Sequence, residues 1–483
     1  MRKYLLLIIA LPFILPVSYA QNKGYTPKIE PCACAFKADS GLKTQCAYLI
    51  VPENRNKPNG KTIKLPFIYV ESNNPNKHKD PVLYTTGGPG GSSLGGVRFI
   101  HQRQFFKNRD YIAFEQRGTQ YALPCLKCDE VNEAIKEAYR KNLPKDSLVL
   151  EATKVCRKKL VDQGIDLSAY NSEESAADIE DLRSALNIDS INLVGISYSG
   201  GLMMTVMRNY PQHIRSVTLD SALPGYVNYE EDAMFTINEA FNKVFGNCER
   251  DSTDKALYGH LKERFQQYFT SINGKSFYLK YLEKGKTDSI SIKYTSNDLL
   301  DILTDGLSSN RDLKNVPHMI NDLISGKHQA YLKPRFDGLF DSNGGGALAM
   351  RYSVYCSEQI AYADQAVIDK QNDVFPYMAH YRFNNVDHPI CDCWKVKPVS
   401  KAAKTIVYSN IPVLLSAGDT DPWCGTYYND LIHHYMPNSQ RLLFTDKTHA
   451  PLLNTKVGDE LLAVFLDAPH QQVKPDGKTV TTY

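Results

Sequence analysis

The chain lacks the features that mark several large classes of protein. Its 56 lysine and arginine residues nearly balance 53 aspartate and glutamate residues, so the formal net charge is only +3, and no block of like charges stands out. Proteins that bind nucleic acid or adhere strongly to membranes carry a larger basic excess. After residue 20 no stretch is long and apolar enough to span a bilayer, and no internal repeat is present. We therefore expect no nucleic-acid partner and no stable membrane insertion.

The first twenty residues have the organisation of an export signal. Arg2 and Lys3 precede an apolar run over residues 5–17, and Ser18 and Ala20 are the small residues that precede a cleavage site. The run is short and holds two prolines, which favours a cleaved signal over a membrane anchor. We expect cleavage after Ala20 and a soluble protein that is exported to the periplasm or secreted.

The 11 cysteines agree with export, because disulfides form in oxidising compartments. They fall into close groups, which suggests disulfides with one thiol left over; the groups are Cys32, Cys34 and Cys46; Cys125, Cys128 and Cys156; and Cys391, Cys393 and Cys424. A metal site at Cys125 and Cys128 is the alternative, but no second CxxC or HxxxH lies nearby. We expect no metal and no cofactor, and the pairing stays open.

Strand-like and helix-like segments alternate in two blocks, which predicts a mostly parallel sheet covered on both faces. The first block has strands over residues 47–51, 63–70, 81–85, 111–115, 191–194 and 216–220, and helices over 171–186 and 200–210. The second has strands over 411–416 and 441–445, helices over 427–435 and 457–465, and a loose end from Pro469.

A long block between these two shows only helical patterns, over residues 229–245, 255–272, 297–307 and 316–324. We interpret it as a helical lid inserted into the sheet domain. The expected organisation is a signal at 1–20, the first part of the sheet domain at 21–223, the lid at 224–398 and the second part of the sheet domain at 399–483.

A serine at the end of a buried strand is the central chemical signal. A nucleophilic serine on a sharp strand-to-helix turn needs small residues two positions away on either side, and Gly195 and Ser199 meet that need around Ser197. Ser199 in turn lies between Ser197 and Gly201, so it is the alternative nucleophile. We favour Ser197 because it directly follows the strand.

The remaining parts of a serine hydrolase site are found in the expected order. Backbone amides of Tyr198 and of Gly88, in the glycine-rich loop after an earlier strand, are candidates for the oxyanion hole. His449 follows a late strand and is the candidate base. Asp421 is the candidate orienting acid, because the following proline holds it extended; Asp419 is the alternative.

Together these pieces resemble the prolyl iminopeptidase and tripeptidyl aminopeptidase branch of the α/β-hydrolases. The resemblance covers residues 45–225 and 405–455 and is carried by the segments GGPGGS (87–92), EQRGT (115–119) and AADIEDL (176–182), the serine turn, GDTDP (418–422) and His449. It implies the α/β-hydrolase fold and matches Ser197, Asp421 and His449 to the family's triad. The matching segments differ from many relatives at Thr86, Glu115 and Ser199, which weakens any transfer of substrate preference.

The same resemblance implies a peptide substrate with a free N-terminus, whose ammonium needs a carboxylate near the acyl site. Glu358, in a Cys-x-Glu segment of the lid, is the first candidate, and Glu230, Glu231 and Asp232 are further ones. We expect an exported serine exopeptidase that cleaves short peptides through an acyl-enzyme. A carboxylesterase or lipase, or a binding protein that has lost catalysis, are the alternatives.

Overall fold

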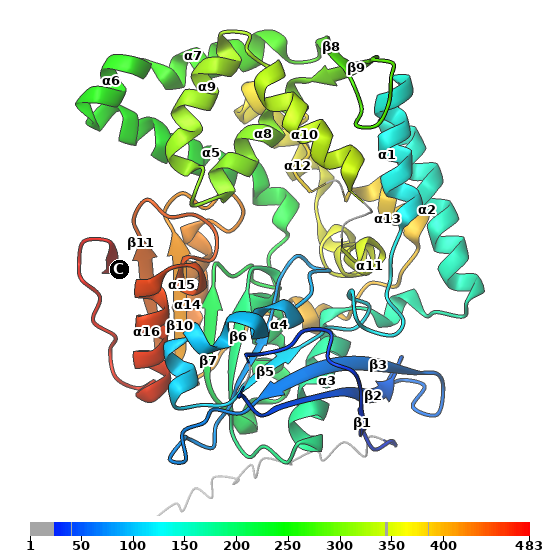
Figure 1. Ribbon diagram of the computed structural model, residues 1–483, viewed down its shortest axis with the longest axis vertical. Helices are drawn as coiled ribbons and strands as arrows, with labels where there is room; N and C mark the ends of the chain where they lie inside the picture. The colour runs from blue at the N-terminus through cyan, green and yellow to red at the C-terminus, as the bar shows by residue number, and fades with distance from the viewer. Residues whose placement is uncertain (1–23, 40, 343–345, 385) are drawn as a thin grey trace, which may run out of the picture.

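The structure, a computed structural model, describes residues 24–39, 41–342, 346–384 and 386–483. The predicted export signal and its cleavage point after Ala20 lie outside these residues. A sheet with its covering helices forms the lower half in Figure 1, and a larger group of helices lies above the upper edge of the sheet. None of the helices in the described ranges combines the length and apolar character needed to cross a membrane.

A ten-stranded sheet runs through the described chain in the order β1-β2-β3-β5-β4-β6-β7-β10-β11-β12. The strands are β1 (Lys28–Pro31), β2 (Thr44–Pro52), β3 (Thr62–Val70), β4 (Val82–Thr85), β5 (Tyr111–Phe114), β6 (Ile191–Ile196), β7 (Ile214–Asp220), β10 (Val413–Gly418), β11 (Ser439–Phe444) and β12 (Val480–Thr482). The six strands from β5 to β11 in this order run parallel to one another, and the outer strands β1, β2, β3 and β12 join them by antiparallel pairing. The predicted mostly parallel sheet is confirmed.

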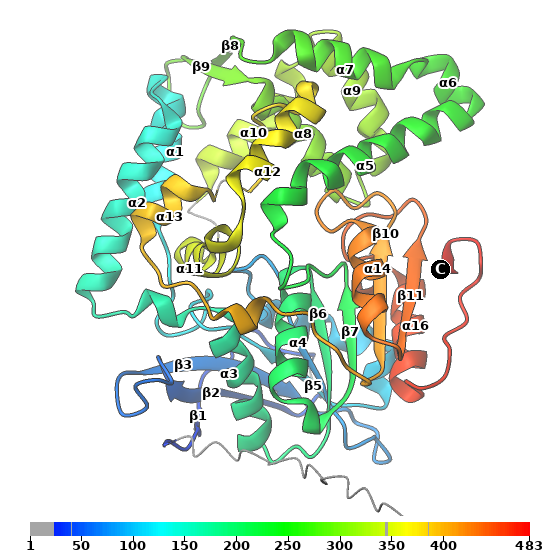
Figure 2. The same cartoon turned by 180° about the vertical axis from the view of Figure 1, so that it is seen from behind.

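Helices cover both faces of this sheet (Figures 1 and 2). On one face lie α3 (Ser172–Ala185), α4 (Tyr198–Asn209) and α14 (Thr426–Tyr435), and on the other lies α16 (Lys456–Asp467), after the short α15 (Pro451–Asn454). The central strands are buried on both faces, which explains their nearly continuous apolar sequences. Because parallel strands end at one edge, the loops after β4, β6, β7, β10 and β11 all meet below the upper helices.

The upper part contains the block predicted as a lid, and it adds features that the sequence patterns did not indicate. Its helices are α5 (Tyr229–Arg250), α6 (Ser252–Tyr258), α7 (Leu261–Ile272), α8 (Ser296–Ser308), α9 (Val316–Ile324), α10 (Gln329–Asp341), α11 (Leu348–Glu358), α12 (Gln365–Val374) and α13 (His388–Trp394). The single helix predicted over 255–272 is interrupted at Gly259. A hairpin of β8 (Ser276–Tyr281) and β9 (Ile290–Thr295) joins them, and α1 (Asp129–Lys141) and α2 (Lys145–Asp162) pack with α11 and α13.

The C-terminal end is not loose, so this prediction was wrong. After α16 the chain returns as β12, which pairs antiparallel with β11, and Val473 and Val480 are buried. Asp476 forms the turn before β12, where its carboxylate accepts the amides of residues 478–480. A polar sequence concealed this strand, because Val480 is its one buried side chain.

Three disulfides join Cys34 to Cys46, Cys128 to Cys156, and Cys356 to Cys391. The expectation of a single free thiol was wrong: five cysteines are free, namely Cys32, Cys125, Cys248, Cys393 and Cys424. An odd count requires only that at least one thiol stays unpaired. The Cys356–Cys391 bridge ties α11 to α13 within the lid.

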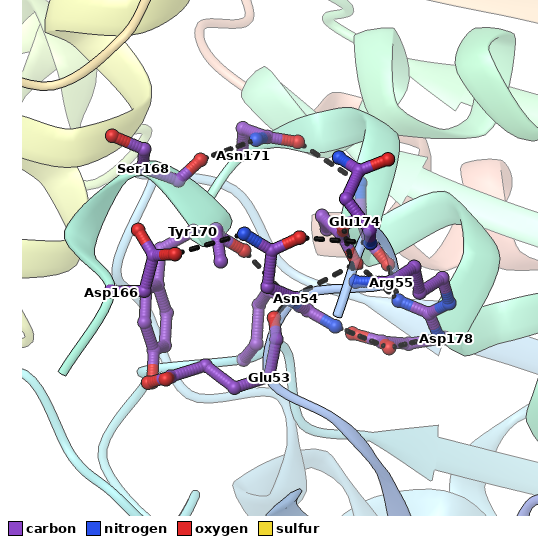
Figure 3. A network of polar contacts seen from close by, with 12 residues as sticks. Glu53, Asn54, Arg55, Asp166, Ser168, Tyr170, Asn171, Glu174 and Asp178 are labelled. Carbon is purple, nitrogen blue, oxygen red and sulfur yellow. Dashed lines mark hydrogen bonds and ion pairs between the residues drawn. The ribbon is translucent and has the colours of Figure 1, made fainter. Parts of the chain in front are cut away.

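A buried polar network fixes α3 against the first strands (Figure 3). Arg55, just after β2, contacts Glu174 and Asp178 of α3 at 2.6 Å each. Arg117, after β5, donates two further hydrogen bonds of 2.8 Å to Asp178. The segments EQRGT and AADIEDL, which carry part of the family resemblance, therefore meet in one bidentate pair. This pair sets the position of α3 and of Ser172 at its start.

Candidate active site

Ser197 occupies a sharp turn between β6 and α4. Its φ of +56° lies in the left-handed region, which is unfavourable for a residue with a side chain and is found most often at functional sites. The turn needs glycine at Gly195, because a Cβ there would lie 2.5 Å from the carbonyl oxygen of Ser199. A Cβ on Gly87 would lie 2.7 Å from the Cβ of Ser197, so this glycine lets the loop after β4 approach the serine.

The neighbouring Ser199 points into the protein. It is fully buried, its Oγ donates to the carbonyl of Thr85 at 2.7 Å, and it accepts the amide of Ile196 at 3.0 Å. Ser199 therefore ties the serine turn to β4. Of the two candidate nucleophiles, Ser197 lines the pocket described below.

Asp421 and His449 form a close pair after β10 and β11. Nδ1 of His449 lies 2.8 Å from Oδ2 of Asp421, and the other carboxylate oxygen accepts the amides of Trp423 and Cys424. The carboxylate is thus held in place by its own turn. The alternative acid, Asp419, instead pairs with Lys243 of α5 at 2.6 Å.

The surroundings of His449 favour its charged form. Burial lowers the pKa of the imidazole, but the charge and hydrogen bond of Asp421, helped by the charge of Asp220, outweigh burial and raise it. The Trp423 ring packs edge-on against the imidazole with 4.9 Å between the ring centroids. An imidazole held in this way accepts a proton readily and keeps one orientation.

Asp220, at the end of β7, holds the loop that carries His449 and was not among the predicted site residues. Its buried carboxylate accepts the amides of Leu452 and Leu453 and the hydroxyl of Ser416, while the Ser221 hydroxyl accepts the amide of Ala450. Burial raises the pKa of Asp220 to about 6, although these hydrogen bonds oppose the shift. A charged residue ending an otherwise buried strand was the signal that would have identified it.

These groups face a pocket of about 400 Å³ between the sheet edge and the lid. The sheet side contributes Ser197, His449 and residues 86–88 of the glycine-rich loop after β4, which we call the oxyanion loop. The lid contributes Tyr229, Arg351, Tyr355 and Phe383. Among the described residues, the Ser197 hydroxyl makes no hydrogen bond to His449; it lies 4.0 Å from the thiol of Cys424. Catalytic hydrogen bonds of this kind often shorten only when substrate is bound.

The two candidate oxyanion donors come from two segments that meet beside Ser197, the start of α4 and the loop after β4. Tyr198 is the first residue of α4, so its amide has no acceptor within the helix. Gly88 lines the same pocket in the loop after β4, with a φ of +124° that suits only glycine. Two residues that follow β5 hold the same loop from the sheet side. Glu115 accepts the Ser93 amide and the Ser92 hydroxyl, and Gln116 donates to the Thr86 carbonyl.

The predicted ammonium-binding carboxylates have different surroundings. Both oxygens of Glu358 are bonded to Ser172, at 2.5 and 2.7 Å, behind the side chain of Tyr198. Glu231 accepts the amide of Asp364 and the side chain of Asn228. Neither of these two glutamates lines the pocket.

Glu230 directly follows Tyr229, which lines the pocket, although Glu230 itself is not a lining residue. One of its oxygens accepts from Asn384 at 2.6 Å, while its other oxygen accepts no hydrogen bond from the described residues. Burial raises the pKa of Glu230 to about 7, against the effects of Asn384 and of the positive charge on Arg351. Within the described ranges, no group of three or more histidine, cysteine, aspartate or glutamate side chains is arranged to hold a metal ion.

Comparisons with known proteins agree with this architecture. A family described as having the alpha/beta hydrolase fold matches residues 80–454. The tripeptidyl aminopeptidase of Streptomyces lividans is 26% identical over 209 residues, which are 40% of this chain and only 38% of that protein. The serine protease Hip1 of Mycobacterium tuberculosis is 22% identical over 412 residues, covering 78% of this chain and 76% of the relative.

The solved structure of a proline iminopeptidase from Mycobacterium smegmatis is also similar. It is 13% identical with a TM-score of 0.41, and the match covers 88% of this chain and 98% of that one. The family match and the named relatives confirm the resemblance found in the sequence motifs.

Proposed function

This chain belongs to the α/β-hydrolase fold family, and from that premise we propose that it is an exported serine exopeptidase that releases amino acids or short peptides from free N-termini. The observation that carries the proposal is the arrangement of one pocket. The strained Ser197 and His449, which is paired with the buried Asp421, face it from the sheet, and Glu230 directly follows Tyr229 of its lid side.

The proposed reaction follows from these positions. Ser197 attacks the peptide carbonyl while Nε2 of His449 takes its proton, and Asp421 keeps the imidazole in the required tautomer. The amides of Gly88 and Tyr198 stabilise the negative oxygen of the tetrahedral intermediate. His449 then protonates the leaving amine, and a water molecule hydrolyses the acyl-enzyme by the same steps.

Glu230 is the proposed anchor for the substrate ammonium. Of the three predicted glutamates it is the one that directly follows a pocket-lining residue, Tyr229, and also has an oxygen without a hydrogen bond from the described residues. The neighbouring aromatic side chains of Tyr229 and Tyr355 exclude water there, which strengthens a pairing between carboxylate and ammonium. Three disulfides are typical of proteins in oxidising compartments and support the export part of the proposal.

The test compares peptide 4-nitroanilides with free and with acetylated N-termini. The wild-type protein should prefer the free form, and Glu230→Gln should lower kcat/KM for that form by roughly 10- to 100-fold, since a hydrogen bond to a charged group contributes about 1.5–3 kcal/mol. The preference should also decline as the pH falls below about 7, because Glu230 becomes protonated.

Glu231→Gln is the matched comparison, since it alters the next residue on the same helix. If Glu231→Gln rather than Glu230→Gln removed the preference, the anchor would be reassigned. Equal cleavage of free and acetylated peptides would refute the exopeptidase proposal, and turnover of a short acyl ester without any amide turnover would favour an esterase.

A further inference from the structure

The lid helix α11 contacts the oxyanion loop directly at two places. The Ala347 amide, just before the helix, donates to the Gly90 carbonyl at 3.3 Å, and Nη1 of Arg351 donates to the Gly88 carbonyl at 2.5 Å. The residues joined by the second contact are 263 positions apart in the chain. A part of the lid therefore holds the loop that would supply one oxyanion donor.

The loop needs such support because its own backbone is permissive. Gly88 and Gly90 both have φ values above +100°, a backbone conformation that is open to glycine but is rarely adopted by residues with a side chain. From the sheet side, Glu115 and Gln116 hold the loop at Ser92, Ser93 and Thr86, but they do not contact Gly88. Arg351 is thus the side chain that fixes the peptide group next to the proposed donor.

The Arg351 guanidinium is also connected, through Asn384, to the proposed ammonium anchor Glu230. Its Nη2 donates to the side-chain oxygen of Asn384, and the side-chain nitrogen of Asn384 donates to Glu230 at 2.6 Å. Asn384 is buried, so this chain of hydrogen bonds is shielded from water over part of its length. Gly88, Arg351, Asn384 and Glu230 form one continuous series, which we name the lid relay.

We propose that Arg351 is a positioning residue that fixes Gly88 for oxyanion stabilisation and, through Asn384, links substrate binding at Glu230 to the oxyanion hole. The second half of this inference rests on the proposed exopeptidase function, whereas the first half requires only that Ser197 is the nucleophile. A planar guanidinium with several donors is suited to this role, because a lysine ammonium on a flexible stem does not hold both acceptors in one plane.

The experiment uses the full-length protein with Arg351→Met, which keeps the length of the side chain and removes its donors. Arg382→Met is the matched control: Arg382 is a second lid arginine, next to the pocket-lining Phe383, but it pairs with Asp146 and Asp387. For each protein we would measure thermal unfolding, kcat and KM for the free and acetylated peptides, and the rate at which a fluorophosphonate labels Ser197. Labelling reports on the oxyanion hole because the phosphoryl oxygen occupies it.

Arg351→Met should lower kcat and the labelling rate by roughly 10- to 100-fold with little change in KM, somewhat less than the loss expected when a donor is removed outright. Millimolar guanidinium should restore part of the labelling rate, which a purely structural defect would not allow. Asn384→Ala keeps the Arg351–Gly88 contact, so it should label faster than Arg351→Met while losing the advantage in kcat that a free N-terminus gives.

Labelling of Arg351→Met at the rate of Arg382→Met would overturn the positioning role. If Asn384→Ala kept the full advantage of the free N-terminus, the link to Glu230 would be overturned. Slow labelling of Arg351→Met in an enzyme that shows no preference for free N-termini would support the positioning role and refute the exopeptidase proposal instead.

Discussion

Replacing Asp421 by asparagine should remove most of the activity without disturbing the turn that carries it. The amide oxygen of asparagine can still accept the amides of Trp423 and Cys424, which lie 2.9 and 3.0 Å from Oδ1 of the aspartate. The amide nitrogen would then face Nδ1 of His449 in place of the carboxylate oxygen at 2.8 Å. The imidazole would carry its proton on Nε2, which could no longer take the proton of Ser197.

The size of the loss follows from this change of tautomer. The same substitution in a serine protease triad lowers kcat about 10⁴-fold, which corresponds to about 5 kcal/mol in the activation free energy. The pH dependence should change as well. Burial lowers the pKa of His449, and the charge of Asp421 is the main effect that raises it, so the acid limb of kcat/KM should move to lower pH in the variant.

The assay is kcat/KM against pH with a free peptide anilide, using Asp419→Asn as the control. Asp419 lies two residues away on the same loop but pairs with Lys243, so its replacement should leave both the rate and the acid limb nearly unchanged. If Asp419→Asn caused the larger loss, or if Asp421→Asn retained more than a tenth of the wild-type rate, the assignment of the orienting acid would be wrong.

Three further substitutions separate residues that act in catalysis from residues that support the structure. Ser199→Ala should destabilise the protein by about 1–3 kcal/mol, because it leaves the Thr85 carbonyl and the Ile196 amide without their partner, yet Ser197 should still react with a fluorophosphonate; Ser197→Ala should lose that labelling. Asp220→Asn should flatten the dependence of unfolding free energy on pH. Burial raises the pKa of Asp220 from 3.8 to about 6, so stability is lost as the pH rises through about 6, by about 3 kcal/mol in total. Urea unfolding at pH 4 and pH 7 measures both effects, and a parallel pH dependence of Asp220→Asn and wild type would refute the second.

The sheet was predictable because its strands are short, buried and followed by chemically distinctive residues. The strand predicted over residues 191–194 lies within β6, and the one predicted over 411–416 overlaps β10. The polar residues that follow these strands, Ser197 and Asp421, lie at the same edge of the sheet. The hairpin β8–β9 was missed although residues 290–295 of β9, ISIKYT, alternate between apolar and polar residues in the pattern that predicts a half-buried strand. The helix α1 was missed although its apolar and polar residues are clearly separated on two faces, whereas α2 was missed because its mostly polar sequence shows little periodicity.

The residues on the sheet side of the pocket can be identified from local sequence patterns, whereas those on the lid side cannot, and this difference has a functional consequence. On the sheet side each candidate residue follows a strand, so a local pattern in the sequence is sufficient to identify it. On the lid side Arg351, Asn384 and Glu230 become neighbours only through contacts between α5, α11 and the segment before α13, which no periodicity reveals. If the lid relay links recognition to the oxyanion loop, substitutions on the sheet side should alter the rate for every acyl substrate alike. Substitutions in the lid should alter rate and preference together, because the same hydrogen bonds serve both.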